Sequence, residues 1–154
     1  MISREQIGGL ALSAAALVGI TMSEGYTDQA VQPLPGDKWT IGFGSTENVK
    51  PGDKITPPKA LERALTDVQK YEGAVKKCVT APLAQREYDV YIDLAYNIGT
   101  NNFCTSTLVK KLNTFDYDGA CKEILRWDRF QGVPNKGLAA RRQREYEKCI
   151  GAQS

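Results

Sequence analysis

The chain has 154 residues, of which 42% are hydrophobic and 25% are charged, and this composition predicts one globular domain with a substantial core. A net charge of +2, with "RRQR" at residues 141–144 as the longest basic cluster, argues against nucleic-acid binding. Histidine is absent, which excludes Ser-His-Asp and Cys-His catalysis as well as histidine metal ligands. Any general acid or base is therefore a carboxylate, lysine, tyrosine or cysteine, and neither a metal nor another cofactor is expected.

Residues 2–23 are expected to form the first helix. Within them, residues 6–23 carry no charge over 18 positions, close to the lower limit of the about 17–25 residues of a membrane-spanning helix. The run is rich in Gly, Ala, Ser and Thr, so it is only weakly hydrophobic. It therefore fits either a buried core helix or an uncleaved, releasable export anchor. A cleavable signal peptide is disfavoured, because cleavage would remove the helix that presents Glu24.

Residues 24–57 are expected to form a small β lobe. Prolines and glycines mark turns throughout this region, and "KWTIGFG" at residues 38–44 alternates as a strand does.

The remaining residues, 58–154, are expected to be helical. A long second helix follows "TPP" at residues 56–58 and ends at Pro82, with a predicted core face of Leu61, Leu65, Val68, Val75 and Val79. A third helix covers residues 83–99, with a predicted core face of Tyr88, Tyr91, Ile92, Ala95 and Ile98. Shorter helices are expected at residues 105–113, 116–128 and 137–150. We therefore predict a mainly helical α+β fold in which residues 1–154 form a single two-lobed domain.

Three residues at and after the end of the first helix are candidate catalytic residues. Glu24 directly follows the apolar run, and an apolar environment raises the pKa of a carboxyl, as a general acid requires near neutral pH. Asp37 lies in the "PLPGDKW" turn, and Thr40 opens the strand. Each has an ordinary structural explanation when taken singly. In combination they provide the acid, second carboxylate and water-holding group of an inverting glycoside hydrolase.

Three segments, "EGYTDQAVQPLPGDKWTIGFGST", "LAYNIGTNNFCTSTLVKKLN" and "KGLAARRQREYEKC", occur in this order over residues 24–149. They resemble the phage lysozyme (endolysin) family, the muramidases of glycoside hydrolase family 24. The resemblance implies a lysozyme-like fold, with a small β lobe, a helical lobe and a glycan-binding cleft between them. It also implies hydrolysis, with inversion, of the β-1,4 bond between N-acetylmuramic acid and N-acetylglucosamine in peptidoglycan, for lysis of a bacterial host.

The resemblance also implies roles for single residues. Glu24 matches the general acid of the family, and Thr40 matches the residue that helps to hold the attacking water. Four further residues match positions that bind substrate or buttress the acid: Tyr96, Asn97, Arg141 and Arg142.

The spacing departs from the family pattern at the catalytic base. The family has an Asp nine residues after the Glu and six before the Thr, where this chain has Pro33 and Leu34. Asp28 is too close in sequence to Glu24 to face it across a sugar, so Asp37 is the predicted base. The alternative is that Thr40 and main-chain groups position the water with less help.

The four cysteines contain no C-x-x-C pair, which argues against a zinc site. They fit either two long-range disulfides, formed in an oxidising compartment, or four buried free thiols. We expect Cys78–Cys104, because Cys104 begins the helix that should pack against the end of the second helix. We expect Cys121–Cys149, because a short break joins the helices that carry these two residues.

Two alternatives to a muramidase remain open at this stage. One is a peptidoglycan-binding module that has kept the fold and lost hydrolysis, and the other is a lytic transglycosylase. The expected partner is the peptidoglycan glycan strand, with transient inner-membrane association through residues 6–23, and the chain is expected to be a monomer. It would wait in the host cytoplasm or tethered to the inner membrane, and then act in the periplasm.

Overall fold

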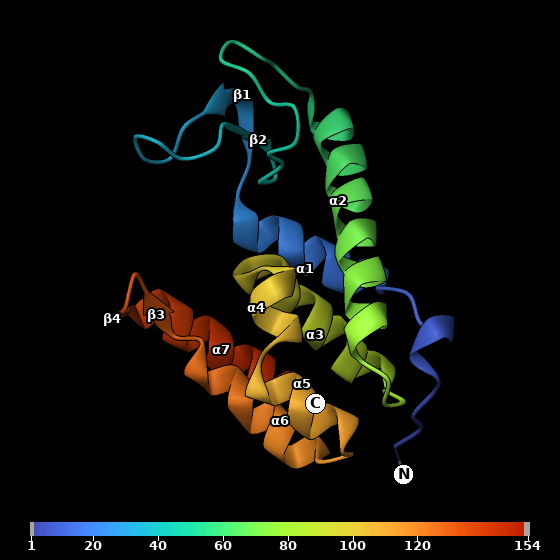
Figure 1. The fold of residues 1–154 in the computed structure, drawn as a ribbon. Coiled ribbons are helices and arrows are strands. Elements are labelled where there is room, and N and C mark those ends of the chain that lie inside the picture. Colours follow the sequence, from blue (N-terminus) through green and yellow to red (C-terminus); the bar gives the residue numbers. More distant parts are fainter. Residues whose placement is uncertain (1, 153–154) are drawn as a thin grey trace. The chain divides into compact units, whose positions relative to one another are not determined.

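The computed structural model describes residues 2–152, which form two compact units (Figure 1). The sheet unit comprises residues 14–70, and the helical unit comprises residues 71–152 together with residues 2–13. Helices predominate, and two small antiparallel sheets of two strands each accompany them. The predicted mainly helical α+β fold class is therefore confirmed.

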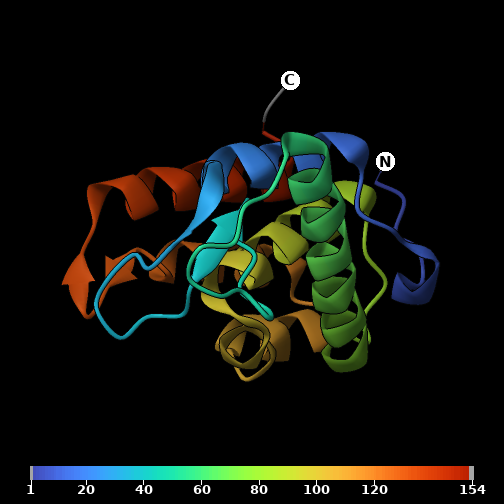
Figure 2. The same ribbon diagram turned by 90° about the horizontal axis from the view of Figure 1, so that it is seen from above.

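The sheet unit begins with helix α1 (Ala14–Glu24), followed by strands β1 (Thr27–Val31) and β2 (Thr40–Gly42). The two strands pair in antiparallel register, with Thr27 opposite Gly42 and Val31 opposite Thr40. The loop of residues 32–39, which joins them, projects away from the strands in both views (Figures 1 and 2). Helix α2 (Pro57–Cys78) begins in this unit, as the "TPP" segment predicted, and ends in the helical unit.

The buried face of the first half of α2 differs from the predicted one. Leu61 and Leu65 are 47% and 44% exposed, whereas Ala60 and Ala64 are buried together with Val68. A Cβ atom added at Gly42 would lie only 2.9 Å from the Cβ of Ala60, so strand β2 approaches the helix very closely here. Only small side chains leave room for this approach. Ala60 therefore faces the strand, and the larger leucines lie on the exposed side of α2.

The first helix is also shorter than predicted. Only residues Ile7–Gly9 (η1, a 3-10 turn) and α1 are helical within residues 2–23, and residues 10–13 between them are not. Glycines are poor helix formers, and Gly8 and Gly9 stand just before the break. Side chains of α2 and α3 bind one backbone group of each of residues 10–13. Within the part of the chain that the structure describes, no helix is both long and apolar enough to span a membrane.

The helical unit is built around α3 (Gln85–Ile98), which packs against α7 (Lys136–Ile150) and α4 (Thr100–Cys104). The predicted core residues Tyr88, Tyr91, Ile92 and Ala95 are buried, whereas Ile98 is only half-buried. The later elements are α5 (Thr107–Asn113), α6 (Tyr117–Glu123) and the 3-10 turn η2 (Ile124–Arg126). A short hairpin, β3 (Arg129–Phe130) and β4 (Val133–Pro134), occupies the break that "QGVPNKG" predicted.

Two disulfides join the cysteines in the expected pairs. Cys78 at the end of α2 is linked to Cys104 at the end of α4, with a Cα–Cα distance of 5.6 Å. Cys121 of α6 is linked to Cys149 of α7, with a Cα–Cα distance of 5.8 Å. The hydroxyl of the buried Tyr91 lies 3.4 Å from Sγ of Cys149 and 3.8 Å from Sγ of Cys121.

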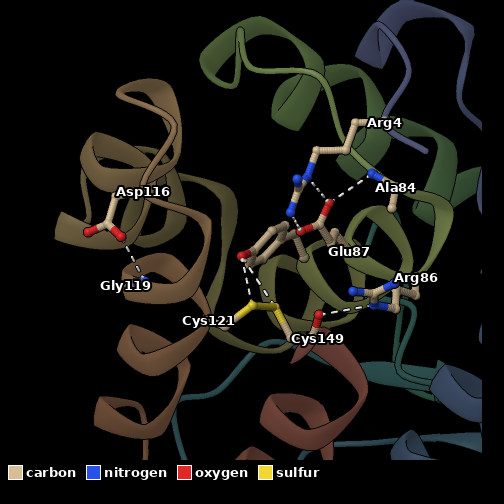
Figure 3. Close-up of a disulfide and its surroundings, with 9 residues drawn as sticks. Arg4, Ala84, Arg86, Glu87, Asp116, Gly119, Cys121 and Cys149 are labelled. Carbon is tan, nitrogen blue, oxygen red and sulfur yellow. Dashed lines mark hydrogen bonds and ion pairs between the residues drawn. A yellow bond between two sulfur atoms is a disulfide. The ribbon is translucent and has the colours of Figure 1, made fainter. Parts of the chain in front are cut away.

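An ion pair fixes the N-terminal residues to this same region. Arg4 donates two hydrogen bonds of 3.0 Å to Glu87, which also accepts the Ala84 N–H at the start of α3 (Figure 3). The Arg4 guanidinium stacks 3.6 Å from the ring centroid of Tyr117. Arg4 therefore neutralises the buried Glu87 carboxylate, and the same carboxylate caps the start of α3.

Candidate active site

Glu24 is the last residue of α1 and is half-buried. Gly25 follows it with a φ angle of +72°, a conformation that glycine adopts without strain, so the chain leaves the helix at once. The predicted placement of this carboxyl at the junction of an apolar helix and a turn is what the structure shows.

Gly44 lies against the Glu24 side chain. A Cβ atom added at Gly44 would stand 3.3 Å from Oε2 of Glu24 and 3.8 Å from its Cβ and Cγ. The chain reaches this position because residues 41–45 form a tight reversal, in which Ile41 and Ser45 exchange backbone hydrogen bonds of 2.9 and 3.0 Å. Gly44 has a φ angle of +88°. The second glycine of "GFG" therefore allows main chain to border one side of the carboxylate.

Two aromatic side chains pack together beside Glu24 and Gly44 in the sequence. The rings of Tyr26 and Phe43 lie 5.3 Å apart in a tilted arrangement, and Tyr26 donates a 3.3 Å hydrogen bond to the carbonyl of Ile55. Tyr26 lies two residues after Glu24, and Phe43 directly precedes Gly44. Their contacts hold the end of α1 and the reversal after β2 in a defined relation.

Thr40 opens β2, as predicted. It is half-buried, and its hydroxyl donates a 3.3 Å hydrogen bond to the carbonyl of Lys38. Its partner across the ladder is Val31, at the end of the hairpin remote from the Thr27–Gly42 pair.

Asp37 lies in the projecting loop and is exposed. Its carboxylate accepts a 3.1 Å hydrogen bond from Leu34 N–H, and its own N–H donates a 3.0 Å bond to the Leu34 carbonyl. The loop leaves the ladder at Val31 and returns at Thr40, so Asp37 is carried at the hairpin end opposite to Glu24. One oxygen of this carboxylate thus closes its own turn.

The other predicted site residues belong to the helical unit. Tyr96 and Asn97 are consecutive on α3 and have different neighbours. The Tyr96 ring lies 4.8 Å from that of Tyr71, whereas the Asn97 side-chain oxygen accepts a hydrogen bond from Arg142 of α7.

Arg141 and Arg142 form a charged cluster with two carboxylates that sequence reasoning missed. Arg141 bonds Asp93 at 2.9 Å and Glu145 at 3.2 Å, and Arg142 lies 3.3 Å from the second oxygen of Glu145. The spacing of Glu145, three and four residues after the arginines, is a sequence signal that could have identified its part in this cluster. Asp93 could be found only from the packing of α3 on α7.

Burial dominates the electrostatics of this cluster. Arg142 is 0% exposed and Glu145 is 5% exposed. Desolvation lowers the pKa of Arg142 and raises the pKa of Glu145 to about 8, and the nearby Asp93 contributes to the latter shift. Within residues 2–152, Nε and Nη1 of Arg142 and Oε2 of Glu145 are buried without a hydrogen-bond partner.

The predicted site residues are divided between the two units. Glu24, Asp37 and Thr40 lie in the sheet unit, and the other four lie in the helical unit. No group of three or more Cys, Asp or Glu residues among the described residues has the arrangement of a metal site.

Comparison with known proteins identifies relatives over almost the whole chain. The family model described as phage lysozyme matches residues 21–145. An endolysin of Acyrthosiphon pisum secondary endosymbiont phage 1 is 38% identical over 138 residues, which cover 87% of this chain and 94% of that protein. A protein named SAR-endolysin from Pseudomonas phage phiKMV is 34% identical over 142 residues, covering 89% and 87% of the two chains.

Comparison with solved structures also identifies endolysins as similar proteins. The endolysin from Escherichia coli O157:H7 phage FAHEc1 superimposes with a TM-score of 0.83 at 31% sequence identity, covering 96% of this chain and 98% of that one.

Proposed function

This chain belongs to the phage lysozyme family, and we propose that it is an endolysin that hydrolyses the β-1,4 bond between N-acetylmuramic acid and N-acetylglucosamine in bacterial peptidoglycan. The observation that carries the proposal is the position of Glu24. Its half-buried carboxyl stands at the end of an apolar helix, bordered by the main chain at Gly44. From this position the Glu24 carboxyl is proposed to act as the general acid that protonates the leaving glycosidic oxygen.

In the proposed reaction, water attacks the anomeric carbon from the face opposite to Glu24. Thr40 holds that water, and Asp37 accepts its proton from the loop of residues 32–39. An inverting enzyme requires about 6.5–9.5 Å between the two carboxyl groups, to leave room for the water. We propose that Asp37 meets this requirement when the loop contacts the glycan, because only one of its oxygens is engaged within the turn.

Tyr96, Asn97, Arg141 and Arg142 are proposed to serve substrate binding or the support of the site. The hydrogen bonds of Arg142 to Asn97 and of Arg141 to Glu145, and the ion pair between Arg142 and Glu145, hold Asn97 and both arginines in fixed positions. All proposed site residues come from one chain, so we propose that the enzyme acts as a monomer and needs no cofactor.

The test of this function is the Glu24→Gln variant, measured by loss of turbidity of Gram-negative cells stripped of their outer membrane. Removal of a general acid should lower the rate about 10²–10⁴-fold. The exposed Glu62→Gln on α2 is the matched control. Wild-type lysis by a folded Glu24→Gln variant would contradict the mechanism.

Product analysis separates the remaining alternatives. Hydrolysis leaves a reducing end, whereas a lytic transglycosylase leaves an anhydro end that is lighter by one water. Binding to peptidoglycan with no released product from the wild-type chain would indicate the binding module instead.

We also propose that residues 6–23 tether the chain to the inner membrane before it acts in the periplasm. Support comes from the uncharged run itself and from the similarity to the phiKMV protein named SAR-endolysin. Expression without any pore-forming partner should then produce slow lysis, which Ala15→Asp should abolish. Ala15 is exposed in the structure, so the purified variant should still cleave peptidoglycan.

A further inference from the structure

Residues 10–13 are held by side chains of the helical unit at the place where the predicted first helix is interrupted. The N–H of Leu12 donates a 2.7 Å hydrogen bond to Glu72 of α2. The N–H of Ser13 donates a 3.0 Å bond to Oδ1 of Asp89 on α3, and the Ser13 hydroxyl donates a 2.7 Å bond to Oδ2 of the same carboxylate. Two carboxylates therefore bind two successive backbone donors.

The carbonyls of the preceding residues are bound in the same way. Lys76 of α2 donates a 2.5 Å hydrogen bond to the Leu10 carbonyl, and Gln85 of α3 donates a 2.8 Å bond to the Ala11 carbonyl. Four successive residues are thus recognised through their backbone by four side chains, which we call the capture site: Glu72, Lys76, Gln85 and Asp89. In Figure 1 the N-terminal segment runs beside the end of α2 and the start of α3.

The capture site is organised by its own contacts. Gln85 donates a 2.9 Å hydrogen bond to Asp89, which is 6% exposed. The hydroxyl of the buried Tyr88 donates a 2.7 Å bond to Glu72, and the Lys76 ammonium lies 5.7 Å from the centroid of the same ring. Fixed, partly buried charges make stronger hydrogen bonds than flexible exposed ones. The site can therefore compete for backbone groups that a helix would otherwise bond internally.

Residues 10–13 also lie in the first half of the uncharged run of residues 6–23. In a bilayer, each of their backbone groups must be bonded within a continuous helix, because lipid offers no partner. In the structure, one backbone group of each of these residues is bonded to a charged or amide side chain of the helical unit. One backbone N–H cannot donate to both sets of partners, and residues 10–13 are not helical when bound in this way, so capture and helical membrane residence exclude each other.

We propose that Glu72, Lys76, Gln85 and Asp89 are a capture site that draws the N-terminal segment from the membrane and prevents its return. The inference rests on the proposed membrane-tethered stage, and it assigns the direction of release to residues of the enzyme body. Because the segment is only weakly hydrophobic, leaving the bilayer costs little free energy. The hydrogen bonds of the capture site then make the released state the more stable one. The site is complete only when α2 and α3 are packed together, so capture follows folding of the helical unit.

The first test compares two serines of the same run. Ser13→Ala removes a capture bond, whereas Ser23→Ala makes the same chemical change at an exposed position of α1, so both raise the hydrophobicity of the segment equally. The chains are expressed without a pore-forming partner, and the fraction that sediments with membranes is measured over time. Loss of a bond to a charged acceptor changes an equilibrium roughly tenfold. Ser13→Ala should therefore remain in the membrane fraction severalfold more than Ser23→Ala.

The second test alters the body of the enzyme and leaves the segment unchanged. Asp89→Asn should increase the membrane fraction and delay lysis, compared with Glu62→Gln at an exposed position of α2. Protein recovered from the supernatant should cleave purified peptidoglycan at the wild-type rate, because the capture site is not part of the proposed chemistry. If Asp89→Asn does not fold, as shown by its near-ultraviolet circular dichroism, the serine pair decides.

Equal partitioning of Ser13→Ala and Ser23→Ala would overturn the capture site and leave both the tethered stage and the muramidase proposal standing. If the wild-type chain never sediments with membranes, the tethered stage fails and the capture proposal fails with it. Cleavage by the purified protein remains a separate measurement of the muramidase activity.

Discussion

Gly44 and Glu24 lie so close that a single added Cβ atom at the glycine would stand 3.3 Å from the carboxylate oxygen Oε2. The two residues are brought together by the tight reversal of residues 41–45 and by the break in the helix at Gly25. The glycine thus determines how much room the proposed general acid has. This relation can be tested separately from backbone strain.

Gly44→Ala should lower the lysis rate beyond what its loss of folding stability explains. Its φ angle of +88° makes any side chain costly, by about 1–3 kcal/mol, and the added methyl group also crowds Glu24. Gly52→Ala is a matched control, because Gly52 has the same φ angle of +88° and no heavy atom within 4 Å of the added Cβ. Urea unfolding and lysis rates are measured for both variants. Equal losses of activity would show that only backbone strain matters.

Asp37→Asn should reduce the rate at least about tenfold, because it removes the proposed base and retains an oxygen that can accept the Leu34 N–H. Asp53 provides the control, since it makes the same turn with Lys50. Its carboxylate accepts the Lys50 N–H at 2.9 Å, and its own N–H donates to the Lys50 carbonyl at 3.1 Å. Asp53→Asn should therefore retain the rate. If both variants lyse cells like the wild type, Asp37 is a turn residue alone.

The Glu145 carboxyl should make stability depend on pH. Burial raises its pKa in the folded state to about 8, above the ordinary glutamate value of 4.5, so the folded chain binds the proton more tightly than the unfolded chain. Its contribution to stability is therefore greatest below about pH 4.5 and decreases as pH rises from about 4.5 to about 8. Glu145→Gln should flatten this part of the profile, measured by urea unfolding at several pH values. An unchanged slope relative to wild type would contradict the raised pKa.

Removal of either disulfide should destabilise the chain by about 2–4 kcal/mol, because the loops are similar in length, with sequence separations of 26 and 28 residues. Cys121 and Cys149 are 2% and 1% exposed, and their bridge contacts Tyr91. The Cys121→Ala/Cys149→Ala variant should therefore lose more stability than Cys78→Ala/Cys104→Ala, through additional loss of packing. Thermal unfolding compares the two. A smaller loss for the buried pair would show that packing around Tyr91 is not significant.

The sequence by itself determined those features that depend on short-range pattern. Apolar spacing and the "TPP" and Gly99 boundaries predicted α2 and α3 to within a few residues, and the "EG", "TIGFG" and "GLAARR" segments pointed to the family. The end of the first helix next to Glu24 followed from the end of the apolar run at Ser23. The pairing of cysteines followed from which predicted helix ends could meet.

Only the tertiary structure decided which of several compatible arrangements is adopted. Leu61 and Leu65 fit an apolar face, yet close approach of Gly42 to Ala60 turned the alanines inward. Residues 10–13 fit a helix, yet Glu72, Lys76, Gln85 and Asp89 bind one backbone group of each in another conformation. In each case the deciding partner is at least 18 residues away along the chain. Local propensity contributes tenths of a kcal/mol per residue, whereas close packing and charged hydrogen bonds contribute one or more, so the distant partner prevails.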